Sequence, residues 1–267
     1  MNNAFYIGAT ALEANQRAVD VLAANIANAN STAYKRSEVQ FSELMNANPT
    51  DPSEIVAEPF ATSIDQEPGG VQGQTSSRIF DQGPLNMTGR SSDIAINGDG
   101  FFELLGPSGQ LMLWRGGTLE VNADGYLAAT NGYPLKQLIS VPDNAGPLQI
   151  STDGKVSAVI GNASTISELG QIGLAHVRDT SELTSLGAGL YSAESKRDPL
   201  GTTNVISTVA GQDGAGVIVQ GAQEASNVSL TTEMTNLLLT QRTYSANAQV
   251  VQAADQLMGL ANSLRHT

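Results

Sequence analysis

The stretch ANIANANSTAYKRSEVQF, residues 24–41, decides how the start of this chain folds. Apolar residues before it recur with the period of a helix, yet the same face carries Asn25 and Asn28 where leucine is expected. Residues 30–32 then break the pattern with Asn, Ser and Thr. We therefore predict a helix that ends in this stretch, and we interpret its amides as groups that fix how the helix meets other copies of the chain.

Two adjacent apolar stripes are predicted on this N-terminal helix. The first is an a/d heptad seam, with members seven residues apart and a matching offset set. It comprises Phe5, Leu12, Val19 and Ile26, with Gly8, Asn15, Leu22 and Ala29 at the offset positions. The second comprises Ile7, Ala14, Val21 and Asn28, with Ala11, Ala18 and Asn25. A helix that is apolar on two faces needs more than one neighbour.

A second long helix is predicted at the other end of the chain, from a cap at Ser226 or Asn227 to about Leu264. Its heptad seam comprises Leu230, Leu237, Tyr244, Val251 and Met258, with Met234, Gln241 and Ala248 at the offset positions. A further stripe comprises Val250, Leu257 and Leu264, with Ala254 and Ala261. A buried amide penalises wrong registers more than the right one. The candidates for this role are Asn15, Asn25, Asn28 and Gln241.

The middle of the chain is predicted to be β-structure. Residues 91–135 alternate short apolar segments with the turn sequences NGDG, GPSG, NADG and TNG, which are typical of hairpins, and residues 147–160 repeat this pattern. The expected fold class is α+β, in which terminal helices pack together as a coiled-coil-like wall around a mainly antiparallel β middle. The expected divisions are an N-terminal assembly helix and turn (1–45), an extended Pro/Gly-rich connection (46–73), a β-rich outer domain (74–225) and a C-terminal assembly helix (226–267).

The net charge of −13 is concentrated in the middle of the chain. Residues 46–225 carry 8 basic and 20 acidic residues, whereas both ends are nearly neutral. Neutral ends suit packing against identical neighbours, and an acidic middle suits a wetted outer surface. A basic face for nucleic acid is lacking, and the doublets Lys35-Arg36 and Lys196-Arg197 are interpreted as solvated ends of elements.

The sequence has no cysteine, so it can form neither a disulfide nor a thiolate metal site. It also lacks the apolar run of a cleavable secretory signal or of a membrane span. If the protein leaves the cytoplasm, we expect it to use a route that needs no such signal.

Candidate catalytic residues are few. His266 lies one residue from the C-terminus, a poor place for a rigid base, and His176 is expected to be a structural residue on a strand. The Asp-Gly pairs lack the ligand spacing of a calcium loop. Glu103 and Glu120 could form a glycosidase pair, but a chain with 26 acidic residues offers many such pairs. We predict no enzymatic activity, no cofactor and no metal site.

Three segments, taken in order, resemble the axial proteins of the bacterial flagellum, the rod and hook family. Residues 11–36 are similar to the family's signature helix and turn, residues 92–104 to its central β-motif, and residues 226–258 to its C-terminal helix motif. Within the family, residues 169–193 and 214–228 favour a distal-rod subunit, with a proximal-rod or other axial subunit as the close alternative.

The resemblance implies a structural function in motility. Family members are exported unfolded through the flagellar type III apparatus and assemble into a helical tube that crosses the periplasm. The implied partners are copies of the chain, other rod and hook proteins, the outer rings that act as a bushing for this drive shaft, and the export apparatus. Neither nucleic acid binding nor membrane insertion is expected. A periplasmic enzyme acting on peptidoglycan and a surface adhesin are the remaining alternatives.

Two further expectations concern the terminal helices. Ala33 stands where the family usually has glycine, so the turn after the first helix is expected to avoid positive φ. Because a lone helix pair cannot cover the second stripes, we expect these helices to gain much of their order from assembly. The residues expected to carry self-assembly are Phe5, Leu12, Asn15, Val19, Leu22, Asn25, Ile26, Asn28, Leu230, Met234, Leu237, Gln241, Tyr244, Val251, Leu257, Met258 and Leu264.

Overall fold

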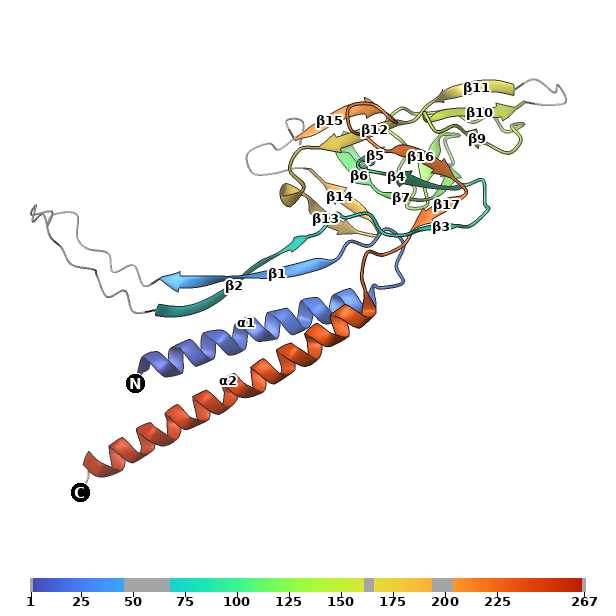
Figure 1. The fold of residues 1–267 in the computed structure, drawn as a ribbon. Coiled ribbons are helices and arrows are strands. Elements are labelled where there is room, and N and C mark those ends of the chain that lie inside the picture. The colour runs from blue at the N-terminus through green and yellow to red at the C-terminus, as the bar shows by residue number, and fades with distance from the viewer. Residues whose placement is uncertain (1, 46–67, 161–165, 194–203, 266–267) are drawn as a thin grey trace, which may run out of the picture. The chain divides into compact units, whose positions relative to one another are not determined.

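The computed structural model describes residues 2–45, 68–160, 166–193 and 204–265 of the 267-residue chain (Figure 1). Within these ranges one long helix lies at each end of the chain. The middle consists of short strands whose described registers are antiparallel. The α+β fold class that the sequence predicts is therefore confirmed at this level.

The chain divides into two compact units. Unit 1 comprises Met1–Ile26, Ser37–Ser77 and Leu230–Thr267, and unit 2 comprises Ala27–Arg36 and Arg78–Ser229. Each unit is therefore assembled from segments that are far apart in the sequence.

Unit 1 contains both helices and a two-stranded ribbon. Helix α1 spans Asn2–Ala27 and α2 spans Leu230–Arg265. The ribbon pairs β1 (Ser37–Met45) with β2 (Pro68–Arg78). The two helices run antiparallel along one another (Figure 1). Among the described residues, neither helix combines the length and the apolar character that crossing a membrane requires.

The ends of these elements differ from the sequence prediction. Helix α2 begins at Leu230, so the predicted cap at Ser226 or Asn227 is wrong. The side chain of Asn227 bonds other segments instead, and its Oδ1 accepts a hydrogen bond from the Arg36 amide at 2.7 Å. The ribbon is not among the predicted elements. Residues 68–73 of the expected connection belong to β2, and residues 46–67 lie outside the described residues.

Unit 2 is made of short strands and two single-turn 3-10 helices. The strands are β3 (Leu85–Met87), β4 (Asp93–Asn97), β5 (Phe101–Leu105), β6 (Leu111–Trp114), β7 (Gly116–Val121), β8 (Leu127–Ala129), β9 (Gln149–Ile150), β10 (Lys155–Val159), β11 (Ile166–Gln171), β12 (Gly173–Val177), β13 (Thr184–Gly187), β14 (Leu190–Ser192), β15 (Val205–Val209), β16 (Val217–Gln220) and β17 (Ala222–Glu224). The 3-10 helices are η1 (Pro107–Gly109) and η2 (Thr180–Glu182).

Two sheets form the body of unit 2. The larger has the order β13-β14-β6-β5-β12-β15, and the smaller has the order β16-β4-β7-β8. The main apolar core takes residues from both sheets, including Ile94 and Ile218 from the smaller one and Phe102 and Leu174 from the larger one. The larger sheet is also apolar on its other face, because Phe101 belongs to a second buried cluster.

Two of the turn sequences close hairpins as predicted, whereas a third connects strands of different sheets. GPSG joins the paired strands β5 and β6, and NADG joins β7 to β8, so both are hairpin loops. NGDG is not a hairpin, because β4 and β5 belong to different sheets. Its two glycines have φ of 114° and 123°, which suits a corner where the chain passes between sheets. Arg115 occupies the return corner between β6 and β7.

Gly116, just after this second corner, tests the fold of unit 2. A Cβ added there would lie 2.7 Å from the Ile94 carbonyl oxygen, at a backbone φ of 127°. Gly116→Ala should therefore destabilise unit 2 by about 3 kcal/mol. The matched control is Gly109→Ala, also at positive φ but with open space around the added Cβ, for which we expect about 1 kcal/mol. Fluorescence of Trp114, the single buried tryptophan, reports chemical unfolding of this unit. Equal effects of the two substitutions would contradict the predicted clash.

Candidate functional site

Helix α1 is covered on two sides within unit 1. On one side, a Cβ at Gly8 would lie 2.5 Å from a methyl carbon of Val251, so α2 approaches the α1 backbone closely. On the other side, the Thr10 hydroxyl accepts a hydrogen bond from the Val71 amide of the ribbon at 3.5 Å. Ala14, between these sides, is buried. The two neighbours that the double stripe of α1 needs are therefore α2 and the ribbon of the same chain.

Asn25 joins three segments of unit 1. Its amide nitrogen donates to the Ser37 carbonyl oxygen at 2.8 Å and to the Glu233 carboxylate at 3.2 Å. Its oxygen accepts from the Ser37 amide at 3.0 Å. Asn25 and Glu233 are both 1% exposed. These bonds fix the register of α1 against the first residue of β1 and the first turn of α2, whereas a role for Asn25 between chains stays a prediction.

The other predicted assembly residues of the N-terminal region lie along α1, except Asn28, which is the first residue after the helix. Asn15 donates to the Ala11 carbonyl oxygen of its own helix at 2.9 Å, and the Asn28 side chain accepts from the Ser31 hydroxyl at 3.2 Å. Phe5 is exposed, and the half-buried residues are Leu12, Asn15, Val19, Leu22, Ile26 and Asn28.

On α2 the face turned to the rest of unit 1 follows the predicted heptad only in part. Its buried or half-buried residues are Glu233, Asn236, Leu237, Thr240, Asn247, Ala248, Val251, Ala254 and Met258. Leu230, Met234, Gln241, Tyr244 and Leu257 are exposed in the single chain, and the side chain of Leu264 lies outside the described part of the chain. Whether these residues act in self-assembly stays a prediction.

A second stripe on α2 is left uncovered within unit 1. Its members follow one another at alternating spacings of four and three residues, which is the heptad spacing. They are Leu239, Thr243, Ala246, Val250, Ala253, Leu257 and Leu260, and all are exposed. We call this set the outer stripe. Its large members are between 55% and 63% exposed, although they are as apolar as core residues.

In unit 2, one carboxylate holds two buried cations. Glu224 accepts hydrogen bonds from Lys35 Nζ at 2.7 Å and from Arg115 Nε at 2.7 Å, and the three side chains are 0–3% exposed. The Gly83 amide adds a third bond to Glu224 at 2.8 Å. Arg115 also donates to the carbonyl oxygens of Gly98 and Gly100. We call Lys35, Arg115 and Glu224 the ion cluster.

The ion cluster ties together three segments of unit 2. Residues 33–36 lead out of α1, residues 79–83 follow β2, and residues 224–227 lead into α2. Lys35 Nζ also donates to the Asp81 carbonyl oxygen at 2.7 Å. Asn227 completes the junction with bonds to the backbone of Arg36, Ile79 and Asp81. The interpretation of Lys35 as a solvated residue is therefore wrong, because its ammonium is buried and donates to the Asp81 carbonyl oxygen and the Glu224 carboxylate.

Ala33 corrects a second expectation. Its φ is 56°, so the turn after α1 does use positive φ although the residue is alanine. The Ala33 amide donates to the Glu224 carbonyl oxygen at 2.8 Å, and the residue is 1% exposed. A left-handed alanine costs roughly 1–2 kcal/mol, and the tertiary hydrogen bond with its surrounding packing holds the residue in that conformation.

Burial shifts two ionisable groups in this region. Burial lowers the pKa of Lys35, although the nearby Glu224 carboxylate opposes the shift. Burial raises the pKa of the Tyr191 hydroxyl to about 12. Tyr191 packs against Phe80 and Phe101, with ring centroids 5.1 and 5.8 Å away.

The residues considered for catalysis are not brought together. Glu103 is 1% exposed and pairs with Lys136 at 2.9 Å, whereas Glu120 is exposed on a strand of the other sheet. His176 lies half-buried on β12. No group of three or more His, Asp or Glu side chains that could hold a metal lies together in the described part of the chain.

Asp93 was not identified from the sequence as a structural centre. Its carboxylate is fully buried and accepts hydrogen bonds from the side chains of Arg90 and Thr118 at 2.8 and 2.7 Å, and from the Thr88 hydroxyl. Burial alone would raise the pKa of Asp93, but these hydrogen bonds outweigh it and lower that pKa. An aspartate at the start of an apolar strand is the one local signal that could have indicated this role.

Comparison with known proteins finds matches to both helical ends of the chain and to its β middle. Residues 5–35 match a family described as flagella basal body rod protein, and residues 95–158 match the flagellar hook protein FlgE/F/G D1 domain. Residues 219–264 match the C-terminal region of the flagellar basal body rod FlgEFG protein. The three matched segments cover most of α1, the region from β4 to β10, and most of α2. The chain belongs to the flagellar hook and basal-body rod family.

Full-length relatives make the assignment more specific. The chain is 33% identical over 265 residues to the flagellar basal-body rod protein FlgG of Agrobacterium fabrum, covering 97% of this chain and 98% of that protein. It is 30% identical over 271 residues to FlgG of Borreliella burgdorferi, covering 99% of both. It is also 29% identical over 271 residues to the flagellar hook-basal body complex protein FlhP of Bacillus subtilis, covering 96% of this chain and 97% of that protein.

The protein is thus a structural rod subunit of the bacterial flagellum, and its place is the basal-body rod. The predictions of a rod subunit, of a role in motility and of a non-enzymatic protein are confirmed, and the FlgG relatives agree with the distal-rod prediction. A rod protein implies assembly with other rod and hook components.

Asn25 provides a test of unit 1. Asn25→Leu removes three hydrogen bonds and leaves the Ser37 backbone and the Glu233 carboxylate with fewer partners in a buried site, which should cost about 3 kcal/mol. Asn15→Leu is the matched control on the same helix, where the amide bonds only its own helix, and it should cost less than about 1 kcal/mol. Denaturant unfolding followed by the helical circular dichroism signal measures both. If Asn15→Leu lowered the free energy of unfolding more than Asn25→Leu, Asn25 would not be the amide that holds the three segments of unit 1 together.

Glu224 provides a test of unit 2. Glu224→Gln leaves two buried cations without their counter-charge, and we expect a loss of about 3–5 kcal/mol in unfolding free energy. Glu168→Gln is the control, because its pair with Lys155 is exposed and 3.9 Å long, and it should change stability by less than about 0.5 kcal/mol. Trp114 fluorescence again reports the transition. A Glu224→Gln protein as stable as the control would show that the ion cluster does not hold the junction.

Proposed function

We propose that this rod subunit forms the distal part of the rod, as a helical tube whose inner wall consists of α1 and α2 from many copies. Within one copy the two helices pack as a coiled-coil-like pair, and between copies the outer stripe of α2 is the contact. The observation that carries this proposal is the heptad spacing of the outer stripe together with its exposure in the single chain.

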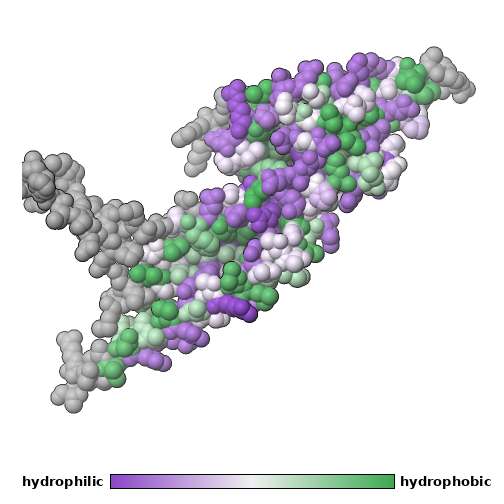
Figure 2. Space-filling model, in the orientation of Figure 1, coloured by the Kyte–Doolittle hydropathy of each residue, from purple (hydrophilic) through white to green (hydrophobic). Residues whose placement is uncertain are grey.

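The outer stripe supplies enough apolar area to drive association. Figure 2 shows apolar side chains at the surface of the helices, interspersed with polar ones. Fully burying a leucine contributes roughly 1.5–3 kcal/mol. Leu239, Leu257 and Leu260 are more than half exposed, so most of this gain remains available to a neighbouring copy.

The hydroxyls of α2 are suited to the same burial. The Thr243 hydroxyl, on the outer stripe, donates to the Leu239 carbonyl oxygen at 3.0 Å. Thr235, Thr240 and Ser245 donate to their own helix in the same way. A hydroxyl already bonded to the helix can be buried without leaving an unsatisfied donor. These four hydroxyl side chains are therefore compatible with an interior wall.

Beyond other rod components, we propose three specific partners for the subunit: the surrounding rings, the export apparatus and the hook. We propose that the acidic middle of the chain faces outward, where a wetted surface discourages adhesion to the surrounding rings, and that the nearly neutral helices face inward. Export through the flagellar type III apparatus and contact with the hook are part of the same proposal. That the helices gain much of their order from assembly stays a prediction, although α1 is covered within one chain.

Two alternative functions, a proximal-rod subunit and a surface adhesin, have less support than the distal rod. A proximal-rod position would use the same helices and differs only in its neighbours. A surface adhesin would lose attachment and keep motility when its gene is deleted, whereas a rod subunit would lose motility.

Substitutions on α2 test the proposed contact. Leu239→Ser should raise the critical concentration for polymerisation about tenfold, since a loss of 1.4 kcal/mol per contact corresponds to that factor. Leu238→Ser is the matched control: Leu238 is 61% exposed on the same helix but lies off the outer stripe. Polymer is measured by sedimentation and electron microscopy, with motility as the readout in cells. Equal effects of the two substitutions, or no effect of Leu239→Ser, would refute the outer stripe as the contact.

A further inference from the structure

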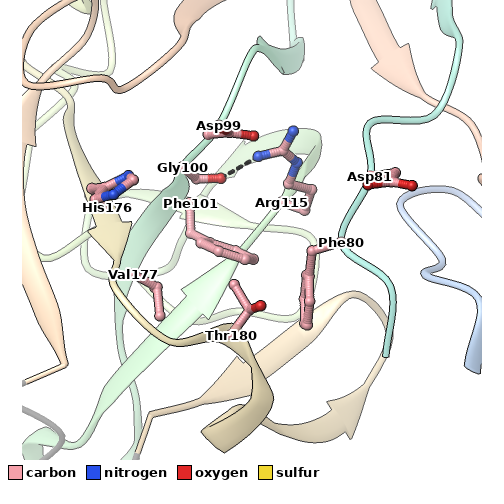
Figure 3. Close-up of a pocket in the computed structure, with 9 residues that line it drawn as sticks. All are labelled: Phe80, Asp81, Asp99, Gly100, Phe101, Arg115, His176, Val177 and Thr180. Carbon is pink, nitrogen blue, oxygen red and sulfur yellow. Dashed lines mark hydrogen bonds between the residues drawn. The ribbon is translucent and has the colours of Figure 1, made fainter. Parts of the chain in front are cut away.

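Unit 2 contains an open pocket of about 270 Å³ beside the ion cluster. Figure 3 shows Phe80 and His176 on opposite sides of it, with Phe101, Val177 and Thr180 between them. The exposed side chains of Asp81 and Asp99 complete its lining. The pocket thus combines an aromatic and apolar interior with two carboxylates that solvent reaches.

The lining is rich in hydrogen-bond acceptors and poor in free donors. Two carboxylates and the Thr180 hydroxyl can accept bonds from a bound group. The one cation of the lining, Arg115, is already bonded to Glu224, Gly98 and Gly100. Phe80 is half-buried and offers aromatic surface to the pocket, whereas Phe101 is 4% exposed and already has the Arg115 guanidinium 5.8 Å from its ring centroid. Such a lining favours a cation with several donors that can stack on aromatic rings.

His176 lies half-buried at the edge of the pocket. Its Nδ1 atom is buried and has no hydrogen-bond partner in the described part of the chain. Because His176 lines the pocket, its imidazole can report on a group that binds there.

The size and charge of the pocket favour the guanidinium group of an arginine side chain as its occupant. Its volume is below the roughly 300–1,000 Å³ of sites for drug-sized ligands. It lies in the acidic middle of the chain, which attracts positive charge. Arg242 of α2 has the required chemistry: it is exposed, and its guanidinium has no ion pair or hydrogen bond among the described residues.

We propose that this pocket binds a guanidinium group, namely that of Arg242 from a second copy of the chain. This inference rests on the proposed function, because only an assembled rod presents one copy to another. It adds a polar, side-chain-specific contact to the apolar contact of the outer stripe. Charge pairs of this kind fix register and reject wrong partners more than they add affinity.

Ligand binding to single chains tests the chemistry of the pocket. Methylguanidinium, titrated into the full-length protein, should shift the imidazole NMR signals of His176 saturably, while His266 serves as the internal reference. Acetate should not do so. Asp81→Asn should weaken methylguanidinium binding about threefold and Asp81→Asn/Asp99→Asn about tenfold, whereas Asp143→Asn, at an exposed acid elsewhere in unit 2, should leave it unchanged. No saturable shift, or a response to acetate alone, overturns the proposal.

Charge exchange tests the second copy as the source. Asp81→Arg and Arg242→Asp should each raise the critical concentration for polymerisation, and the double variant should recover most of the loss. Arg178→Asp, at another exposed arginine, is the control and should not rescue Asp81→Arg. Additive losses in the double variant overturn the assignment to Arg242. This failure is distinguishable from failure of the proposed tube, which is judged by Leu239→Ser and not by the pocket.

Discussion

The carboxylate of Glu224 is the constraint on which unit 2 depends. It lies in the interior with a lysine and an arginine bonded to it, and the Gly83 amide donates a further hydrogen bond to it. Such a cluster contributes little net stability compared with apolar side chains of the same volume, but it tolerates almost no rearrangement. The segments that lead to the two helices are therefore joined in one arrangement, together with the segment that follows β2.

The ion cluster also joins residues from widely separated segments of the sequence. Lys35 lies in the turn after α1, Arg115 lies at a corner between the two sheets, and Glu224 ends β17. These positions are 189 and 109 residues apart from Glu224 in the sequence. Each of the three residues belongs to a segment that matches a flagellar family. Nothing in the sequence of these segments indicates that the three side chains meet.

Periodicity predicted the helices and turn sequences predicted two hairpins, because both kinds of element form between residues that are close in the sequence. The seven-residue spacing from Phe5 to Ile26 identified α1, and GPSG and NADG identified two loops correctly. It did not predict what covers a stripe or which strands pair across the chain. The ribbon that packs on α1 was missed because its strands lie on either side of residues 46–67 and lack a tight turn signal. Lys35 was misassigned because burial of a lysine depends on distant acceptors.

The same limit applies to the candidate site. The amide of Asn25 was correctly identified as unusual for a helix face, but its partners on β1 and α2 come from tertiary structure. The positive φ of Ala33 likewise follows from its bond to Glu224 and not from its own preference. On α2, exposure separates the residues that pack within the single chain from those that we propose contact a neighbouring copy.

The threonines and serines of α2 have a consequence for a protein that must exist in two surroundings. In water their hydroxyls keep a long helix hydrated, while in a packed wall each can rely on a carbonyl oxygen one turn earlier. A folded subunit can thus pass from water into the proposed wall without changing any of these hydrogen bonds.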